Sequence, residues 1–356
     1  MKIIVSGGCG FVGSALINAL LDADSSLQIF AFDNFSRPGS YINRDPLQER
    51  GVKLFHADLR NPSDLEDLPR ADWIIDAAAN PAVLAGIDGR TSSRQLLEHN
   101  LLGTVNLLEL AKQQRAGFVL LSTSRVYSID ALAALPVSVR NGCFVPTATA
   151  GLPEGVSELG LSERFDTSPP LSLYGASKLA SETIALEYGA NFEFPVWINR
   201  CGVLAGAGQF GRPDQGIFAF WINSYLRQQP IAYIGFDGSG FQTRDCLHPR
   251  DLVPLIMAQM REQASGKPNT VNLGGGAERA MSLAQLSDWC SKRFPKHSIG
   301  KELRPRPFDI PWLVLDTSLA LQHWGWKPQT SLDAILEEIA LHADANPNWL
   351  RLSAAL

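Results

Sequence analysis

Tyr174 and Lys178 are two residues whose types and spacing could move a proton. They stand in the sequence Tyr-Gly-Ala-Ser-Lys at the start of a helical pattern, and a spacing of four places both side chains on one face of a helix. An ammonium group close to a phenol favours the phenolate and lowers a pKa that is ordinarily about 10. Such a tyrosine can take a proton from a hydroxyl group while hydride leaves the same carbon. Because Tyr–Lys pairs at this spacing also occur on ordinary helix surfaces, the assignment depends on the residues around them.

Thr123 is a second candidate for this chemistry. It follows an apolar stretch at 117–122 that is expected to be a strand. The carboxyl ends of strands are where open parallel sheets bind ligands. A hydroxyl group at this position can hydrogen-bond the reacting oxygen as it becomes a carbonyl. The neighbouring Ser122 and Ser124 are alternatives for the same role.

Gly7, Gly10 and Gly13 form a GxxGxxG pattern between an apolar stretch at 2–6 and a helical pattern at 11–22. Glycine permits positive φ and a close approach of the backbone to a pyrophosphate. The N-terminus of the following helix presents N–H groups and a positive dipole to the phosphates. The pattern therefore predicts a dinucleotide-binding turn.

Asp33 lies 20 residues after Gly13, at the end of the second predicted strand. An acid there accepts hydrogen bonds from the adenosine ribose hydroxyls and repels a 2′-phosphate, which favours NAD over NADP, although Arg37 lies nearby. Asp58, at the end of the third predicted strand, is expected to reach the adenine edge. The small alanines at 77–79 end the fourth predicted strand and leave room for the cofactor.

The elements that must position these residues alternate along the first half of the chain. Near-continuous apolar runs are typical of parallel strands covered on both faces, and helical patterns separate them. The predicted strands are 2–6, 28–32, 52–57, 73–77, 117–122 and 194–200, and the predicted helices include 11–22 and 95–114. We therefore expect an α/β Rossmann fold with a doubly wound parallel sheet.

The chain is predicted to divide near residue 205. Residues 1–205 would form the NAD-binding Rossmann domain and 206–356 a smaller mixed α/β substrate domain, with some crossing of the chain between them. Gly and Pro become frequent in the second part, and strand candidates such as 231–234 and 270–273 are scattered. The long connection at 131–170 is expected to be an active-site loop, because loops of this length are usually functional or disordered.

The composition excludes several classes of protein. The 356 residues carry a net charge of -5, which argues against binding to nucleic acid or to an anionic membrane. The five cysteines are spread without a CxxC pair, so neither a disulfide scaffold nor a metal site is predicted. No leader pattern or apolar run long enough to span a bilayer is seen, and a cytoplasmic enzyme is expected.

Several segments together resemble the extended short-chain dehydrogenase/reductase family, particularly its nucleotide-sugar epimerases and dehydratases. They are the glycine turn, Asp33-Asn34, Asn100-Leu-Leu-Gly-Thr104, Ser122-Thr123 and the Tyr-x-x-x-Lys pair, and the likeness extends over almost the whole chain. The resemblance implies that Thr123, Tyr174 and Lys178 are catalytic and that the C-terminal domain holds a nucleotide diphosphate. The predicted cofactor site comprises Gly7, Gly10, Phe11, Val12, Gly13, Asp33, Asn34, Ser36, Arg37, Asp58, Leu59, Ala77, Ala78, Ala79, Asn100, Ser122, Tyr174, Lys178 and Cys201.

The predicted reaction is epimerisation. The 4,6-dehydratases of the family carry an Asp-Glu pair directly after the catalytic threonine, where this chain has Ser124 and Arg125. Without a carboxylate at these positions, the elimination of water has no obvious catalyst. Epimerisation only requires that one carbinol is oxidised and that hydride returns to its other face, with the cofactor regenerated in each cycle.

Segments 200–206, 209–216 and 242–248, with the long loop, are similar to the subgroup of CDP-paratose (CDP-tyvelose) 2-epimerases. This resemblance implies a CDP-linked deoxyhexose that is epimerised at C2. Ser128, where a glycine is usual, and the charged Arg125 depart from the subgroup and leave the sugar open. The implied substrate site, in which Arg244 and Arg306 clamp the diphosphate and Asp309 orients Arg306, comprises Thr123, Ser124, Arg200, Gln215, Arg244, Arg306 and Asp309.

Other functions remain open on the sequence alone. A UDP-hexose 4-epimerase and a net nucleotide-sugar oxidoreductase would use the same residues. A catalytically silent NAD-binding regulator would need the fold but not the Thr–Tyr–Lys set. A homodimer paired through helices 95–114 and 172–188 is expected from the resemblance, although their apolar faces are equally explained by packing on the chain's own sheet.

Overall fold

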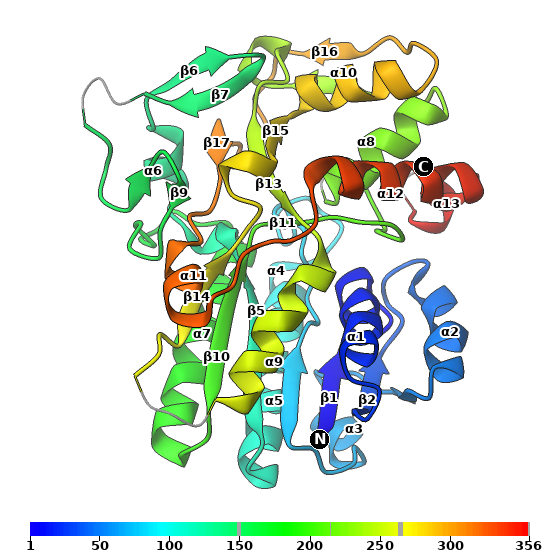
Figure 1. Cartoon of the computed structure of the whole chain (residues 1–356), viewed down its shortest axis with the longest axis vertical. Helices are drawn as coiled ribbons and strands as arrows, with labels where there is room; N and C mark the ends of the chain where they lie inside the picture. The colour runs from blue at the N-terminus through cyan, green and yellow to red at the C-terminus, as the bar shows by residue number, and fades with distance from the viewer. Residues whose placement is uncertain (148–150, 214, 263–265, 355–356) are drawn as a thin grey trace.

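A seven-stranded sheet, with every strand pair parallel, forms one lobe of the computed structural model (Figure 1). The structure describes residues 1–147, 151–213, 215–262 and 266–354. Across the sheet the strand order is β14-β10-β5-β4-β1-β2-β3. The bounds are β1 Lys2–Ser6, β2 Gln28–Asp33, β3 Lys53–His56, β4 Trp73–Asp76, β5 Gly117–Thr123, β10 Val196–Cys201 and β14 Thr270–Leu273.

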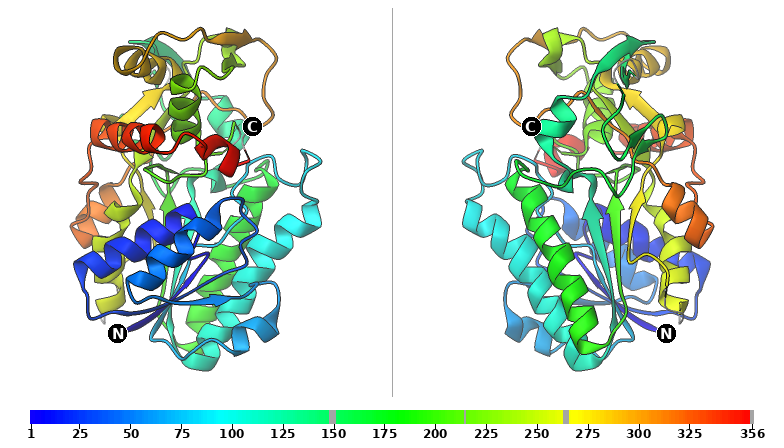
Figure 2. Two further views of the ribbon diagram at one scale, coloured as in Figure 1. Left: turned by 90° about the vertical axis from the view of Figure 1, so that its right-hand side faces the viewer. Right: turned by 90° about the vertical axis from the view of Figure 1, so that its left-hand side faces the viewer.

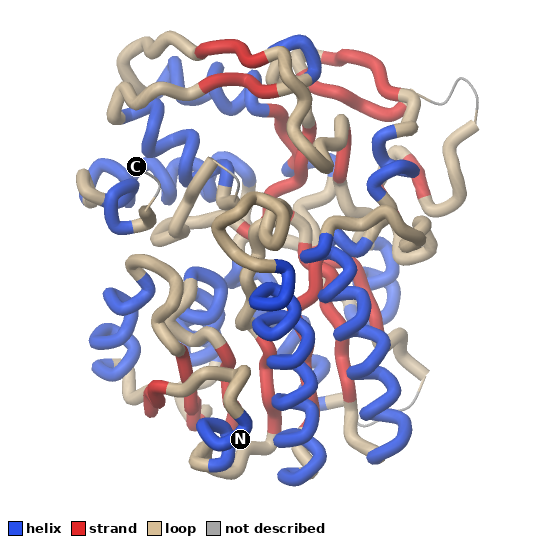
Figure 3. Tube along the Cα trace, turned by 180° about the vertical axis from the view of Figure 1, so that it is seen from behind, coloured by secondary structure: helices blue, strands red, loops and turns tan. Residues whose placement is uncertain are grey.

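Both faces of this sheet are covered by helices, which explains why its strands are apolar without alternation. Ile3 and Val5 of β1 belong to a core shared with α1 (Phe11–Ala23) and α9 (Val253–Arg261). Ile4 belongs to a second core on the opposite face. The helices α5 (Gly103–Gln114) and α7 (Leu173–Phe192) cover that second face and lie in front of the strands in Figure 3.

A second lobe lies beyond the carboxyl ends of these strands (Figures 1 and 2). Its main sheet joins β11 (Val203–Leu204), β13 (Thr243–Leu247), β15 (Ala280–Ser282) and β17 (Trp312–Leu313). The helices α8 (Ile217–Leu226), α10 (Leu283–Arg293) and α12 (Leu332–Ala345) share a separate apolar core. Further elements of the two lobes include α2 Arg44–Glu49, α3 Pro62–Glu66, α4 Ser93–Leu97, η2 Glu98–Leu102, η3 Ser124–Val126, α6 Ile129–Ala133, β12 Ala232–Ile234, β16 Gly300–Glu302, α11 Ser318–Trp324 and α13 Trp349–Leu352.

The predicted Rossmann fold is confirmed, with one correction to its strands. Residues 270–273, which we had expected in the smaller domain, form β14 and pair in parallel with β10 at the edge of the large sheet. The helix α9 also returns to this lobe and packs against α1. The division of the chain at residue 205 remains a prediction.

The segment 131–170 has structure of its own. It contains the hairpin of β6 (Val137–Arg140) and β7 (Cys143–Pro146) and the hairpin of β8 (Val156–Ser157) and β9 (Gly160–Leu161). The first hairpin is fastened to the second lobe, because Thr243 Oγ1 donates to Phe144 O at 2.8 Å. The segment is therefore not a structureless loop. Within the described ranges, no helix is both long and apolar enough to cross a membrane.

Candidate active site

A cavity of about 620 Å³ runs along the carboxyl ends of the parallel strands and into the second lobe. Most of the residues that the sequence had singled out line it. Those are Gly7, Gly10, Phe11, Val12, Gly13, Asp33, Asn34, Ser36, Arg37, Leu59, Ala77, Ala78, Ala79, Ser122, Thr123, Ser124, Tyr174, Cys201, Gln215, Arg244, Arg306 and Asp309. Four others, Asp58, Asn100, Lys178 and Arg200, are not part of the lining.

The glycine turn at one end of the cavity leaves no room for side chains. Gly7 has φ of +62°, and a Cβ built on it would lie 2.9 Å from Ala78 Cα. A Cβ on Gly13 would lie 2.2 Å from Gly7 O. The helix α1 begins at Phe11 and has no side-chain cap at Gly10. The turn is therefore a bare backbone cradle of the kind that a pyrophosphate requires.

Replacing Gly13 with alanine is expected to weaken NAD binding by about tenfold or more, because the added methyl group must displace backbone atoms of the turn. Equilibrium titration of the purified variant with NAD measures this effect. Gly51→Ala is the matched control, since Gly51 has φ of +85° but nothing within 4 Å of its Cβ position. If the Gly13 variant bound NAD as tightly as the control, the turn would not hold the pyrophosphate.

Asp33 closes the cradle at the end of β2. It is 8% exposed, and it accepts hydrogen bonds from the backbone N–H of Cys9 at 3.0 Å and of Phe35 at 2.8 Å. Burial raises the pKa of its carboxyl group, whereas these N–H donors lower it. Its carboxylate lines the cavity beside the turn, as expected of a group that accepts from ribose hydroxyls.

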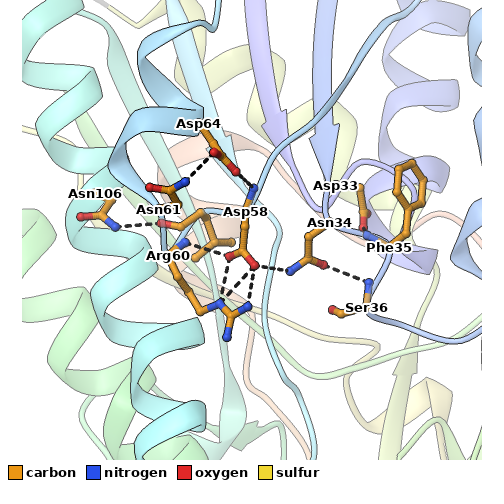
Figure 4. Close-up of polar contacts among 10 residues, drawn as sticks. Asp33, Asn34, Phe35, Ser36, Asp58, Arg60, Asn61, Asp64 and Asn106 are labelled. Atoms are coloured by element: carbon orange, nitrogen blue, oxygen red, sulfur yellow. Dashed lines mark hydrogen bonds and ion pairs between the residues drawn. The ribbon is translucent and has the colours of Figure 1, made fainter.

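Asp58 is not part of the cavity lining, and its carboxylate is bound to its neighbours (Figure 4). Arg60 Nε donates to Asp58 Oδ1 at 2.9 Å, and Asn34 Nδ2 donates to Oδ2 at 3.1 Å. The hydrogen bonds from Arg60 hold the pKa of Asp58 well below its usual range. Leu59, the next residue, lines the cavity in its place. The contact of Asp58 with adenine remains a prediction, since its carboxylate is 22% exposed beside Arg60.

Asp76 is a buried carboxylate that sequence reasoning missed. Ser6 Oγ and Thr104 Oγ1 each donate to it at 2.8 Å, and Ser6 Oγ accepts from the N–H groups of Ala77 and Ala78. This network fixes the alanines that line the cavity. An acidic residue within an otherwise apolar strand was the signal that could have identified it.

The Asn100 side chain is hydrogen-bonded to the backbone of another segment and does not line the cavity. Its Oδ1 accepts from Asn80 N at 2.8 Å, and its Nδ2 donates to Asn80 O at 3.1 Å and to Ser177 Oγ at 3.2 Å. It lies in the π-helical turn η2, where a widened turn is frequent at functional sites. Asn100 thereby connects the chain after β4 to the helix α7 that carries Tyr174.

Tyr174 and Thr123 meet in the middle of the cavity. Tyr174 is 8% exposed, and burial raises the pKa of its phenol. A hydrogen bond with the Thr123 side chain and the nearby charge of Arg125 lower that pKa. Cys201 also lines this region, but burial raises the pKa of its thiol to about 12, so it remains a protonated packing residue.

Lys178 follows Tyr174 by one turn of α7 and is 2% exposed. Burial lowers the pKa of its ammonium group, whereas the charges of Asp76 and Glu182 raise it. Two buried carboxylates, Asp76 at the end of β4 and Glu182 on the same helix, therefore support its charge. The position of Lys178 outside the cavity lining follows from its location one helical turn below Tyr174.

Arg200, predicted to bind substrate, is instead part of a buried ion pair. Its Nη2 lies 2.7 Å from Glu182 Oε2, and the two side chains are 10% and 4% exposed. Glu182 also accepts from Ser122 Oγ, and Arg200 stacks over the ring of Tyr127. The pair ties α7 to β5 and β10 directly beneath the catalytic candidates.

The second lobe contributes Arg244, Arg306 and Asp309 to the cavity, with a pairing that differs from our prediction. Asp309 Oδ1 lies 3.6 Å from Arg244 Nη2, and Asp309 Oδ2 accepts from Gln242 Nε2 at 3.3 Å. Arg306 Nη2 donates to Pro213 O at 3.2 Å. Asp309 thus orients Arg244 and not Arg306.

Further lining residues of the second lobe were not predicted from the sequence. Gln215 lies where expected, but the neighbouring Asp214 falls outside the described residues. The lining that was missed is largely apolar and includes Phe210, Phe218, Trp221, Ile231, Leu283 and Phe308. The aromatic run at the start of α8 was the available signal. The described residues of 131–170 are absent from the lining, so the expectation that this segment covers a sugar has no support there.

Comparisons with known proteins agree with this arrangement. A sequence model described as the NAD dependent epimerase/dehydratase family matches residues 3–274. A CDP-paratose 2-epimerase of Salmonella typhi is 28% identical over 350 residues, which cover 93% of this chain and 96% of the relative. The Bacillus subtilis protein YtcB, described as an uncharacterized UDP-glucose epimerase, is 30% identical over 96% of this chain and 97% of its own length.

Solved structures show the same fold. The UDP-glucuronic acid 4-epimerase of Bacillus cereus, crystallised with UDP-glucuronic acid and NAD, superposes with a TM-score of 0.76. It is 26% identical, and the match covers 97% of this chain and 99% of that one. A UDP-glucose 4-epimerase of Thermotoga maritima gives a TM-score of 0.78 at 20% identity and supports the fold alone.

Proposed function

This chain belongs to the NAD-dependent epimerase/dehydratase family, and from that premise we propose that it is a nucleotide-sugar epimerase. The observation that most directly supports this proposal is that one cavity contains the glycine cradle, the Thr123–Tyr174 pair and the arginines of the second lobe. A cofactor, a reacting carbon and a diphosphate can therefore be held in a single space. The roles of the individual residues in this cavity are part of the proposal.

The cradle fits NAD. Cβ atoms on Gly7 or Gly13 would fill the space that a pyrophosphate needs, and Asp33 lies beside it to accept from ribose hydroxyls and to repel a 2′-phosphate. The remaining lining on this side is Gly10, Phe11, Val12, Asn34, Ser36, Arg37, Leu59 and the three alanines Ala77, Ala78 and Ala79. NAD held in this cradle would supply the hydride acceptor and donor that the reaction needs.

Tyr174 removes the proton from the reacting sugar hydroxyl and later restores it. Thr123 hydrogen-bonds the same oxygen and keeps it close to the phenol. Lys178, fully buried below, supplies a positive charge that favours the phenolate. A cofactor held by the glycine cradle would present its hydride from one side only. The sugar itself must therefore turn within the cavity for its configuration to invert.

Arg244 and Arg306 are proposed to bind the substrate diphosphate. Both guanidinium groups line the cavity on the side away from the glycine turn, and their planar forks suit phosphate oxygens. Gln215 is proposed to contact the hexose or the nucleotide. Arg200 acts in this proposal only through Glu182, as a positioning residue.

The lining argues against dehydration. Among the described residues that line the cavity, the carboxylates are Asp33 and Asp309, and neither follows Thr123. Ser124 and Arg125 occupy the positions that would need an acid and a base. Elimination of water from the sugar therefore has no carboxylate to catalyse it.

We further propose that the substrate is a CDP-linked deoxyhexose and that its C2 is inverted. Support comes from the relative of Salmonella typhi and from the segments 200–206, 209–216 and 242–248. A UDP-hexose 4-epimerase is the second candidate, and the description of YtcB as an uncharacterized UDP-glucose epimerase favours the UDP-hexose. A net oxidoreductase and a silent NAD-binding regulator remain as third and fourth possibilities.

A panel of CDP-, UDP-, GDP- and dTDP-sugars tests these proposals. Purified enzyme with NAD should interconvert CDP-paratose and CDP-tyvelose without net change in NADH absorbance. Turnover of UDP-glucose alone would reject the CDP and C2 assignment but keep the epimerase. Stoichiometric formation of NADH would reject the epimerase in favour of an oxidoreductase, and no turnover of any sugar would favour the regulator.

A homodimer is also proposed, paired through α4, η2, α5 and α7. Apolar side chains on this face are exposed in the single chain, at 39% for Leu97, 44% for Leu102, 36% for Leu186 and 48% for Phe192. Pairing of two copies would remove this apolar surface from water. Light scattering that found a monomer at micromolar concentration would reject the proposal.

A further inference from the structure

Arg125 is a charged residue of the cavity to which the proposed mechanism assigns no role. It lies in the short turn η3, and its backbone N–H donates to Thr123 Oγ1 at 3.2 Å. A Cβ on Gly175 would lie 2.1 Å from Arg125 O, so this turn packs directly against the first turn of α7 beside Tyr174. The backbone of Arg125 is thus locked between the two residues proposed to act on the sugar hydroxyl.

The side chain of Arg125 extends across the cavity toward the second lobe. It is half-buried and lines the cavity, and its Nη1 lies 3.5 Å from Phe308 O. That carbonyl is the one hydrogen-bond acceptor that the described residues provide for the guanidinium group. Because so few acceptors offset its positive charge in a confined site, the guanidinium group interacts electrostatically with the other groups around it.

The charges around Arg125 come from both ends of the cavity. Arg244 on β13 and Arg306 repel it, whereas Asp309 and Tyr174 attract it. Burial and these arginines lower the pKa of its guanidinium to about 10, so it remains charged at neutral pH. Tyr174 is in turn faced by Arg125 and by Cys201 on β10, and its hydroxyl is hydrogen-bonded with Thr123. Lys178, one turn further along the same helix, is faced by Asp76, Glu182 and Cys201.

We propose that Arg125 is a positioning residue for catalysis, whose charge on the substrate side of Tyr174 stabilises the phenolate and so sets the pH range in which the sugar hydroxyl can be deprotonated. The proposal rests on the proposed epimerase function. It assigns one positive charge to the helix of Tyr174 itself, at Lys178, and a second to the turn after β5, at Arg125. A diphosphate bound to Arg244 and Arg306 would offset their repulsion of Arg125, so substrate binding would strengthen this effect.

The test compares Arg125→Met, which removes the charge, with Arg125→Lys, which keeps it. Ionisation of Tyr174 is measured in the NAD-loaded protein by ultraviolet difference titration, with Tyr174→Phe as the reference that removes its signal. The pH profile of kcat is measured alongside. Arg306→Met is the matched control, because it removes a cavity charge that does not face Tyr174.

In Arg125→Met, the phenol should ionise at higher pH, and kcat at neutral pH should fall about tenfold and recover as the pH rises. Arg125→Lys should retain the ionisation of the parent enzyme. Arg306→Met should raise KM and leave the titration in place. If Arg125→Met did not fold, Arg125→Gln would provide the neutral side chain.

A neutral variant that ionises Tyr174 at the parent pH would overturn the proposal, even if its KM rose, because Arg125 would then only hold substrate. The tyrosinate titration needs no nucleotide sugar. Failure of the whole sugar panel would therefore reject the proposed function while the titration still decided the role of Arg125.

Discussion

Replacing Tyr174 with phenylalanine is expected to lower kcat by about 10³-fold or more while NAD binding stays close to that of the parent enzyme. The variant loses only the hydroxyl group that exchanges a proton with the sugar. The ring remains in its 8%-exposed position, so the cavity keeps its shape. Turnover of the best substrate from the sugar panel and titration with NAD measure the two effects.

Tyr188→Phe is the matched control for this experiment. Tyr188 lies on the same helix, and its hydroxyl donates to Glu109 Oε1 at 2.7 Å, away from the cavity lining. Removal of this hydroxyl should leave turnover unchanged. Equal activity in Tyr174→Phe and in the control would reject Tyr174 as the proton acceptor and, with it, the proposed mechanism.

Features that a short stretch of sequence defines could be predicted, whereas contacts between distant parts of the chain could not. The strand at 2–6 and the glycine turn after it were predictable, because one apolar run and three glycines define both over a short stretch. The Tyr174–Lys178 spacing correctly indicated one helix face. It could not show that Lys178 would be buried and would not line the cavity.

The predictions that failed depended on contacts between residues that are far apart in the sequence. Residues 270–273 have the composition of any short strand, and nothing local indicates that they pair with β10, about 70 residues earlier. The same reason explains Asp309, whose neighbour along the chain is Arg306 but whose partner in space is Arg244. The two hairpins within 131–170 are short and half-exposed, so their pattern did not stand out.

The buried pair of Glu182 and Arg200 shows how a residue can serve the site without reaching it. Sequence resemblance assigned Arg200 to the substrate, but its guanidinium is held by Glu182 at 2.7 Å and is not part of the cavity lining. Through Ser122 and Glu182, this pair fixes the end of β5, where Thr123 precedes the turn η3. The charge of Glu182 also supports the ammonium group of Lys178.

Glu182→Ala is therefore expected to lower the free energy of unfolding by about 3–5 kcal/mol, because Arg200 is left charged, buried and unpaired. Urea denaturation measures the loss. Glu109→Ala provides the control, since the Glu109–Lys112 pair is partly exposed, with side chains at 40% and 34%, and should cost at most about 1 kcal/mol.

The double variant Glu182→Met with Arg200→Met distinguishes a lost ion pair from lost packing. Replacing both charges with apolar side chains removes the unpaired guanidinium, so the double variant should be more stable than Glu182→Ala alone. If the double variant were as stable as the parent, the ion pair would add nothing to the free energy of unfolding and would serve only to position its neighbours. In that case kcat should still fall, because Lys178 has lost a carboxylate that supports its charge and Ser122 has lost its acceptor. A double variant that kept both parental stability and parental kcat would reject the positioning role of the pair.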